Sequence, residues 1–191
     1  PIGDNQKTVF DTWDKGQNQF VFGAAGTGKT FILLYKALCD VLNPDNEFDR
    51  VIIVRSLIPT REIGFLPGDE EDKSALYQIN YMNMVRFMFQ QPNEQAFMML
   101  FERLKNQGVL HFMSTSFLRG LTFDNSIVIV DECQNLNFHE LDTIITRVGQ
   151  HSKIAFAGDF FQTDLVKSVE RNGLHDFVRI LDNMKSFNVT E

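Results

Sequence analysis

The sequence predicts an α/β fold with a mainly parallel sheet of about five strands flanked by helices. Short apolar runs of strand length alternate with longer segments whose apolar residues recur at helical spacing, which is typical of a sheet covered on both faces. A glycine-rich loop joins the first such strand to the first such helix. With 191 residues and 43% hydrophobic content, the chain can bury one sizeable core, so we expect a single domain over residues 1–191.

The first half of the chain contains two of the expected strands. "NQFVFG", residues 18–23, is a strand that ends in glycine, and the helical spacing of "TFILLYKALCDVLN" follows it over residues 30–43. "RVIIVRS", residues 50–56, has a β-branched core and predicts a strand buried on both faces. The irregular segment after it, residues 57–74, is too long for a plain connector and is therefore a candidate functional loop.

The second half contains the remaining elements. Residues 76–106 are rich in Met and Phe and predict one or two helices, divided near "QQPNEQ", with the aromatic side chains in the core. Helical periodicity returns in "NFHELDTIITRVGQ". Three apolar runs predict strands: "GVLHFMS", "SIVIVDE" and "KIAFAGD".

Composition excludes several classes of protein. A net charge of −7 argues against coating nucleic acid by bulk electrostatics and leaves only a focal basic surface for such a partner. Cys39 and Cys133 lie far apart without ligands at zinc spacing, so neither a zinc site nor a disulfide is expected. No apolar run approaches the roughly 18 residues of a membrane span, and no signal peptide opens the chain, which begins at Pro1 like a trimmed form. We expect a cytoplasmic protein with no membrane contact.

The loop "GAAGTGKT" satisfies the pattern G-x-x-x-x-G-K-[ST] between a strand and a helix, which is the context that a phosphate-binding loop requires. Its small residues let backbone N–H groups curl around phosphates, Lys29 is expected to reach the β- and γ-phosphates, and Thr30 to offer its hydroxyl to Mg²⁺. A chance glycine-rich turn is the alternative, and the flanking strand and helix argue against it. The expected nucleotide-binding residues are Gly23, Ala24, Ala25, Gly26, Thr27, Gly28, Lys29 and Thr30.

Two acids end the strand "SIVIVDE". We expect Asp131 to hold Mg²⁺ and Glu132 to polarise a water for attack on the γ-phosphate. A strand that ends in two solvated acids is the alternative, and its pairing with a phosphate-binding loop disfavours it. Water is then the expected nucleophile.

The segment "GDFFQ" follows the strand "KIAFA". If this strand lies beside the one that ends in Asp131, then Asp159 and Gln162 face the γ-phosphate, because ligands of open α/β sheets bind beyond the carboxyl ends of the strands. The Gln162 amide could bond a phosphate oxygen or the attacking water and so sense the nucleotide state. A turn whose Asp caps a following helix is the alternative.

Seven strings in order, "GAAGTGKT", "VRS", "GFLPGD", "FLRGLTF", "DECQN", "TRVGQHSK" and "GDFFQTDL", resemble the PhoH family, the phosphate-starvation-inducible ATPases of bacteria and their phages. The resemblance runs from about residue 6 to residue 174. PhoH proteins are similar to the first RecA-like domain of superfamily 1 helicases, so the resemblance implies a RecA-like P-loop ATPase domain. It also implies further sequence beyond Glu191, where the family continues.

The resemblance assigns three helicase motifs. Lys29 and Thr30 match motif I; Asp131, Glu132 and Gln134 match motif II; Gly158, Asp159 and Gln162 match motif III. Cys133 replaces the usual alanine of motif II, which a small buried thiol should allow.

Gln6 lies about 20 residues before the loop, where related helicases use a glutamine to contact adenine. The resemblance therefore implies that Gln6 confers a preference for ATP over GTP, and a surface glutamine near a chain end is the alternative.

The resemblance also implies a homo-oligomer, in PhoH proteins a hexameric ring, in which a neighbour supplies an arginine to the γ-phosphate. The candidates are Arg119, Arg147 and Arg171, each of which could equally be a surface ion-pair partner. For nucleic acid, Arg55, Arg61 and Phe65 offer charge and a stacking surface, whereas the acidic run of residues 69–72 would repel phosphates.

The expected function is Mg²⁺-dependent hydrolysis of ATP to ADP and phosphate by an oligomeric ATPase, coupled to RNA or single-stranded DNA, in the bacterial or phage-infected cytoplasm. The alternative is a nucleotide-dependent switch or scaffold that acts on a protein partner without nucleic acid. A small-molecule kinase is disfavoured, because Glu132 beside the metal would direct water at ATP.

Overall fold

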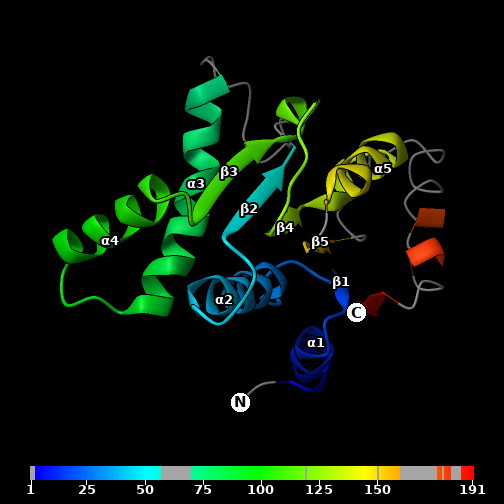
Figure 1. The fold of residues 1–191 in the computed structure, drawn as a ribbon, viewed down its shortest axis with the longest axis horizontal. Coiled ribbons are helices and arrows are strands. Elements are labelled where there is room, and N and C mark those ends of the chain that lie inside the picture. The colour runs from blue at the N-terminus through cyan, green and yellow to red at the C-terminus, as the bar shows by residue number, and fades with distance from the viewer. Residues whose placement is uncertain are drawn as a thin grey trace.

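The central sheet of the computed structural model has six parallel strands in the order β3-β2-β4-β5-β1-β6 (Figure 1). The structure describes residues 3–56, 70–118, 120–149, 151–159, 176–177, 179–181 and 186–191, and of residues 70–76 it describes the backbone. The strands are β1 (Asn18–Phe22), β2 (Arg50–Arg55), β3 (Leu110–Ser114), β4 (Ser126–Asp131), β5 (Lys153–Gly158) and β6 (Phe187–Thr190). The five expected strands are confirmed, and β6 adds a sixth beside β1.

Five α-helices have their bounds within the described residues, and residues 176–177 and 179–181 are also helical. The five are α1 (Asp4–Asp14), α2 (Lys29–Leu42), α3 (Glu70–Phe89), α4 (Glu94–Asn106) and α5 (Phe138–Arg147). The Met- and Phe-rich segment divides into α3 and α4 at the predicted break, because Asn93 caps α4 by accepting a hydrogen bond from the backbone N–H of Ala96 at 2.8 Å. Two 3₁₀ turns, η1 (Thr115–Phe117) and η2 (Cys133–Asn135), follow β3 and β4.

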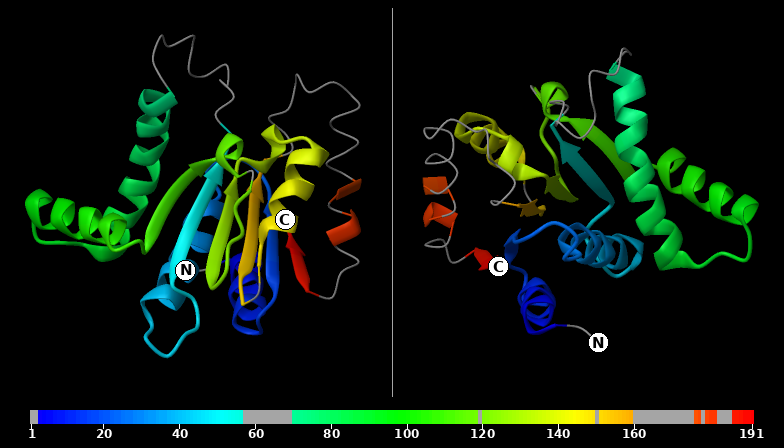
Figure 2. Two further views of the ribbon diagram at one scale, coloured as in Figure 1. Left: turned by 45° about the horizontal axis from the view of Figure 1, so that its top comes forward. Right: turned by 180° about the vertical axis from the view of Figure 1, so that it is seen from behind.

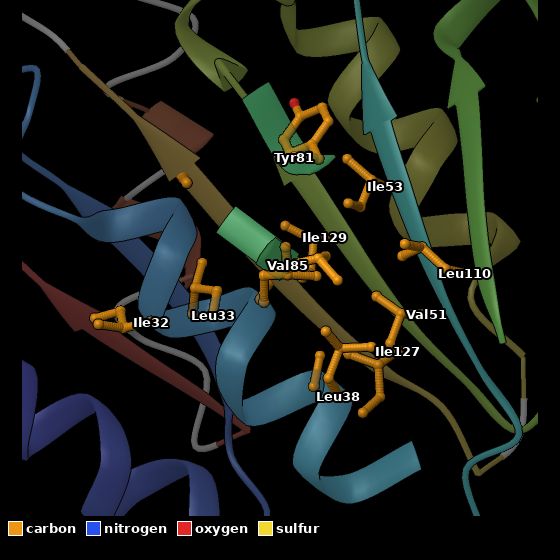
Figure 3. Packing of buried hydrophobic residues seen from close by; sticks show 14 of the residues in the cluster. Ile32, Leu33, Leu38, Val51, Ile53, Tyr81, Val85, Leu110, Ile127 and Ile129 are labelled. Atoms are coloured by element: carbon orange, nitrogen blue, oxygen red, sulfur yellow. The ribbon is translucent and has the colours of Figure 1, made fainter. Parts of the chain in front are cut away.

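Helices cover both faces of the sheet, and alternate strand residues face each layer. Residues of α1 to α4 pack on one face, around Leu33, Val85 and Phe97, while α5 and Phe177 pack on the other, around Phe156 and Ile144 (Figure 2). The first cluster also contains Tyr81 beside Ile53 and Ile129, with its hydroxyl oxygen on the side away from Ile129 (Figure 3). The sheet is therefore buried between two layers, as the apolar strand sequences predict.

The strand order decides what meets at one edge of the sheet. β5 lies between β1 and β4, so the phosphate-binding loop after β1 faces the acids after β4 across the end of β5. All strands are parallel, and their carboxyl ends therefore gather at the same edge, where ligands of such sheets bind. Within the described residues, no helix is long and apolar enough to cross a membrane.

Candidate nucleotide site

The phosphate-binding loop joins β1 to α2 with left-handed backbone at two glycines. Gly26 has φ +78° and Gly28, the residue before α2, has φ +82°. A side chain would be strained at either position, so the pattern of glycines is what lets the loop curl around the start of α2. The Thr27 hydroxyl stiffens the curl by donating to the carbonyl oxygen of Ala24 at 2.9 Å. The loop therefore presents the N-terminal end of a 14-residue helix, which attracts anions.

The Lys29 ammonium lies folded over this loop. Its Nζ donates to the carbonyl oxygens of Gly23 at 2.9 Å and Ala24 at 2.6 Å. These are neutral acceptors, and an ammonium bonds a phosphate oxygen more strongly than a carbonyl because that bond is assisted by charge on both partners. Lys29 is therefore held at the loop by bonds that it can exchange for bonds to a phosphate.

Thr30 and Asp131 meet although 101 positions separate them in the sequence. The Thr30 hydroxyl donates to Oδ1 of Asp131 at 2.8 Å, and the backbone N–H of Glu132 donates to the same oxygen at 3.0 Å. Oδ2 of Asp131 accepts from the hydroxyl of Tyr81 at 2.6 Å. A carboxylate and a hydroxyl side by side are hard oxygen ligands, which suit Mg²⁺ and not a soft metal.

Glu132 has an uncommon backbone conformation for a residue with a side chain, φ 50° and ψ 44°. Such left-handed residues cost about 1–3 kcal/mol and concentrate at functional sites. Its carboxylate accepts a hydrogen bond from the side-chain amide of Gln134. The other end of that amide, Oε1, accepts from the backbone N–H of Asp159 at 3.0 Å. Gln134 thus joins the end of β4 to the end of β5.

Two cavities flank the loop. One, of about 380 Å³, is lined by residues from α2, α3 and the ends of β2, β4 and β5, among them Lys29, Thr30, Tyr81, Asp131, Glu132 and Asp159. The other, of about 870 Å³, lies between α1, the loop and β6, and Gln6, Val9, Ile32 and Thr190 are among its lining residues. The first has ammonium, hydroxyl and carboxylate groups, and the second has apolar and amide groups.

Gln6 is held between the start of α1 and the phosphate-binding loop. Its Nε2 donates to the carbonyl oxygen of Thr27 at 3.4 Å, and its Oε1 accepts from the backbone N–H of Gly3 at 3.2 Å. The amide therefore lies at the larger cavity, as its expected role requires, and its contact with adenine stays a prediction.

Several expected site residues lie outside the described residues: Arg61, Phe65, Arg119, Gln162 and Arg171. Arg147 is described at the last position of α5, near Phe123, whose backbone N–H donates to its carbonyl oxygen. This is the edge of the sheet where β4 and β5 begin, opposite the phosphate-binding loop. Arg147 therefore cannot reach the nucleotide site of its own chain, and its role toward a neighbour stays a prediction.

Sequence reasoning missed Tyr81, and it expected Arg55 to face a nucleic acid. Arg55 ends β2 with a side chain that is only 18% exposed, 3.9 Å from Oδ2 of Asp131, and its guanidinium lies 4.2 Å from the centre of the Tyr77 ring. Tyr81 belongs to a helix predicted to fill the core, and its ring does so. No local pattern in the sequence signals that its hydroxyl lies against Asp131.

The fold and the site define the class of protein: a RecA-like P-loop nucleotide-binding domain. Solved structures share the fold. They include the large terminase of a thermophilic bacteriophage, with a TM-score of 0.54 and 11% identity over 99% of this chain and 45% of that chain. The N-terminal domain of the DNA packaging ATPase from bacteriophage phi29 has a TM-score of 0.51 and 13% identity over 99% of this chain and 95% of that chain. At these identities the likeness concerns the fold alone.

The chain belongs to the PhoH family, whose model, described as PhoH-like protein, matches residues 1–191. The PhoH-like protein of Synechocystis sp. is 34% identical over 94% of this chain and 52% of its own length. Protein PhoH of Escherichia coli is 34% identical over 82% of this chain and 42% of its own. The chain thus spans about half the length of the curated relatives it matches.

Proposed function

We propose that this domain hydrolyses ATP to ADP and phosphate with Mg²⁺, and that RNA or single-stranded DNA stimulates the reaction. The observation that carries the proposal is the meeting of Lys29, the Thr30–Asp131 pair and Glu132 around one cavity at the carboxyl edge of the sheet. In P-loop NTPases these groups bind the phosphates, hold the metal and direct a water.

Each side chain has one task in this proposal. The N–H groups of the loop and the Lys29 ammonium bind the phosphate oxygens, and Thr30 and Asp131 would hold Mg²⁺, which when bound would neutralise phosphate charge. The Glu132 carboxylate accepts a proton from the attacking water. Glu132 bonds Gln134, so this hydrogen bond must be exchanged for one to the water before the proton can move.

Glu132 can be tested as the proposed general base. Glu132→Gln keeps the size and one acceptor oxygen of the side chain but removes the base, so kcat for ATP should fall by about 10²- to 10⁴-fold while the Kd for ATP changes little. Glu102→Gln, in an exposed pair with Lys105 on α4, is the matched control and should turn over ATP like the wild type. Phosphate release and equilibrium binding are measured in parallel. Full turnover in Glu132→Gln would refute the assignment.

The coupled partner is tested by ATP turnover with and without RNA or single-stranded DNA. Stimulation by either polymer supports the helicase-like role. Turnover that no polymer alters rejects that role and leaves a nucleotide-dependent switch that acts on a protein partner. Lys29→Ala is the control. If this variant loses the nucleotide binding that wild type shows, either outcome can be attributed to the site at the phosphate-binding loop.

A further inference from the structure

Tyr81 lies in the middle of α3 with its ring in the apolar core. The residue is 2% exposed, and its ring centre lies 5.6 Å from that of Phe112 on β3. Ile53 and Val85 belong to the same apolar cluster (Figure 3). A phenylalanine would fill this volume equally well, so core packing alone does not explain the hydroxyl.

The hydroxyl completes a set of donors around Asp131. Oδ2 accepts from Tyr81 at 2.6 Å, while Oδ1 accepts from Thr30 at 2.8 Å and from the backbone N–H of Glu132 at 3.0 Å. The three donors belong to α3, to the first turn of α2 and to the turn after β4. Asp131 itself is 5% exposed, so its rotamer is fixed by these bonds and little by solvent.

Tyr81 is chemically suited to donate to this carboxylate. Burial and the negative charge of Asp131 raise the pKa of the Tyr81 phenol well above its usual value of 10.0, so the hydroxyl keeps its proton. Arg55 adds a cation 3.9 Å from Oδ2 and stacks on Tyr77, one turn earlier on α3. Helix α3 therefore contacts the carboxylate directly through Tyr81 and indirectly through Tyr77 and Arg55.

We propose that Tyr81 is a positioning residue that orients Asp131 for metal binding and thereby links α3 to the metal side of the nucleotide site. The inference rests on the proposed function, because it assumes that Asp131 holds Mg²⁺. Partners of this kind, one bond removed from the metal, fix the orientation of the ligand, and their loss typically weakens metal affinity by about 10- to 100-fold. A shift of α3 would move the hydroxyl and so change how tightly the site holds its metal.

The test separates metal binding from nucleotide binding. Mn²⁺ replaces Mg²⁺, and its affinity in the presence of a non-hydrolysable ATP analogue is measured by electron paramagnetic resonance. In Tyr81→Phe we expect Mn²⁺ affinity to fall by at least about tenfold. The affinity for a fluorescent ADP in EDTA should stay within twofold of wild type, because the loop and Lys29 are unchanged. Tyr35→Phe, which removes the hydroxyl of an exposed tyrosine on α2, should change neither affinity.

Three outcomes decide the matter. Mn²⁺ affinity within twofold of wild type in Tyr81→Phe overturns the inference while leaving the proposed ATPase intact. An equal fall in metal-free ADP affinity also overturns it, since Tyr81 would then support the whole site and not the carboxylate. Wild-type protein that binds the nucleotide analogue but takes up no Mn²⁺ overturns the metal role of Asp131, and the inference with it.

A second measurement follows Tyr81 itself, without a substitution at that position. The chain has three tyrosines, so protein labelled with 3-fluorotyrosine gives three ¹⁹F resonances, which Tyr35→Phe and Tyr77→Phe assign. Adding Mg²⁺ to the analogue-bound protein should shift the Tyr81 resonance and leave that of Tyr35 in place. A Tyr81 resonance that does not respond to Mg²⁺ contradicts the proposal.

Discussion

At the scale of single residues, Gly158 shows how closely the turn after β4 approaches the end of β5. A Cβ at this position would lie 2.6 Å from Sγ of Cys133 and 3.1 Å from Oε1 of Gln134. Gly158→Ala should therefore displace the turn and lower the free energy of unfolding by about 1–3 kcal/mol. Urea denaturation of the single variants and of Gly158→Ala combined with Cys133→Ala measures it. The double variant should lose less free energy of unfolding than the two single variants lose together, because the sulfur atom that the new Cβ would meet is gone. Losses that simply add would contradict the contact.

Gln6 tests the base-binding cavity at the same scale. Gln6→Ala removes an amide that bonds Thr27 and that we expect to contact adenine. KM for ATP should rise about 2- to 10-fold, the cost of one or two neutral hydrogen bonds, with kcat little changed. GTP is the internal control, since its base edge presents different groups, and its KM should stay the same. Equal rises for both nucleotides would indicate that Gln6 supports the loop and does not discriminate between bases.

At the scale of elements, α1 is attached to the sheet by a buried lysine. Nζ of Lys153, at the start of β5, donates to the carbonyl oxygen of Trp13 at 3.1 Å and lies 4.4 Å from the Trp13 ring. The Trp13 indole N–H in turn donates to Asp40 on α2 at 2.7 Å. These contacts lie at the end of α1 remote from Gln6, so they fix the helix that carries the expected adenine contact.

Lys153 also makes the attachment of α1 depend on pH. Burial lowers the pKa of Lys153 below the ordinary 10.5. Asp40 and Asp14 raise this pKa by attraction, whereas the nearby charge of Lys36 lowers it further. Between the lowered pKa and 10.5, the unfolded chain binds more protons than the folded chain. The contribution of Lys153 to the free energy of unfolding should therefore increase as the pH rises through this window. Denaturant titrations at a series of pH values give the free energy of unfolding of wild type and of Lys153→Met. Plotted against pH, this free energy should rise in that window for wild type and not for the variant. Parallel curves would contradict the prediction.

At the scale of the whole molecule, we expect the active unit to contain more than one chain. The described residues place no arginine other than Arg55 against the smaller cavity, and Arg55 already contacts Asp131. If a neighbour supplies Arg119, Arg147 or Arg171, then mixing Lys29→Ala chains with chains that lack this arginine should restore turnover that neither shows alone. ATP hydrolysis and native mass of the mixture measure this. A mixture as inactive as its components, for all three arginines, would rule out a site that a neighbour completes with any of them.

Much of the site follows from the sequence alone. The loop, the acids of motif II and the order of elements depend on local patterns: a run of small residues before a helix, apolar runs that end in acids, and periodicities that distinguish strand from helix. These predicted an α/β fold and placed Lys29, Thr30 and Asp131 in one site, which the structure brings together. The sixth strand was missed, because "FNVT" is too short to signal pairing with β1.

Only the tertiary structure decided how the parts meet. Whether β5 would lie between β1 and β4 depends on the pairing of β5 with β1, a strand far away in the sequence, which no local pattern encodes. The same holds for Gln134 as the bridge between Glu132 and Asp159. It holds most clearly for Tyr81, whose bond to Asp131 spans 50 positions. The sequence by itself determined which groups we expect to carry the chemistry, since chemistry is a property of residue type. The packing of α3 on the sheet determined which of them hold one another in place, because such contacts exist only once distant segments are folded together.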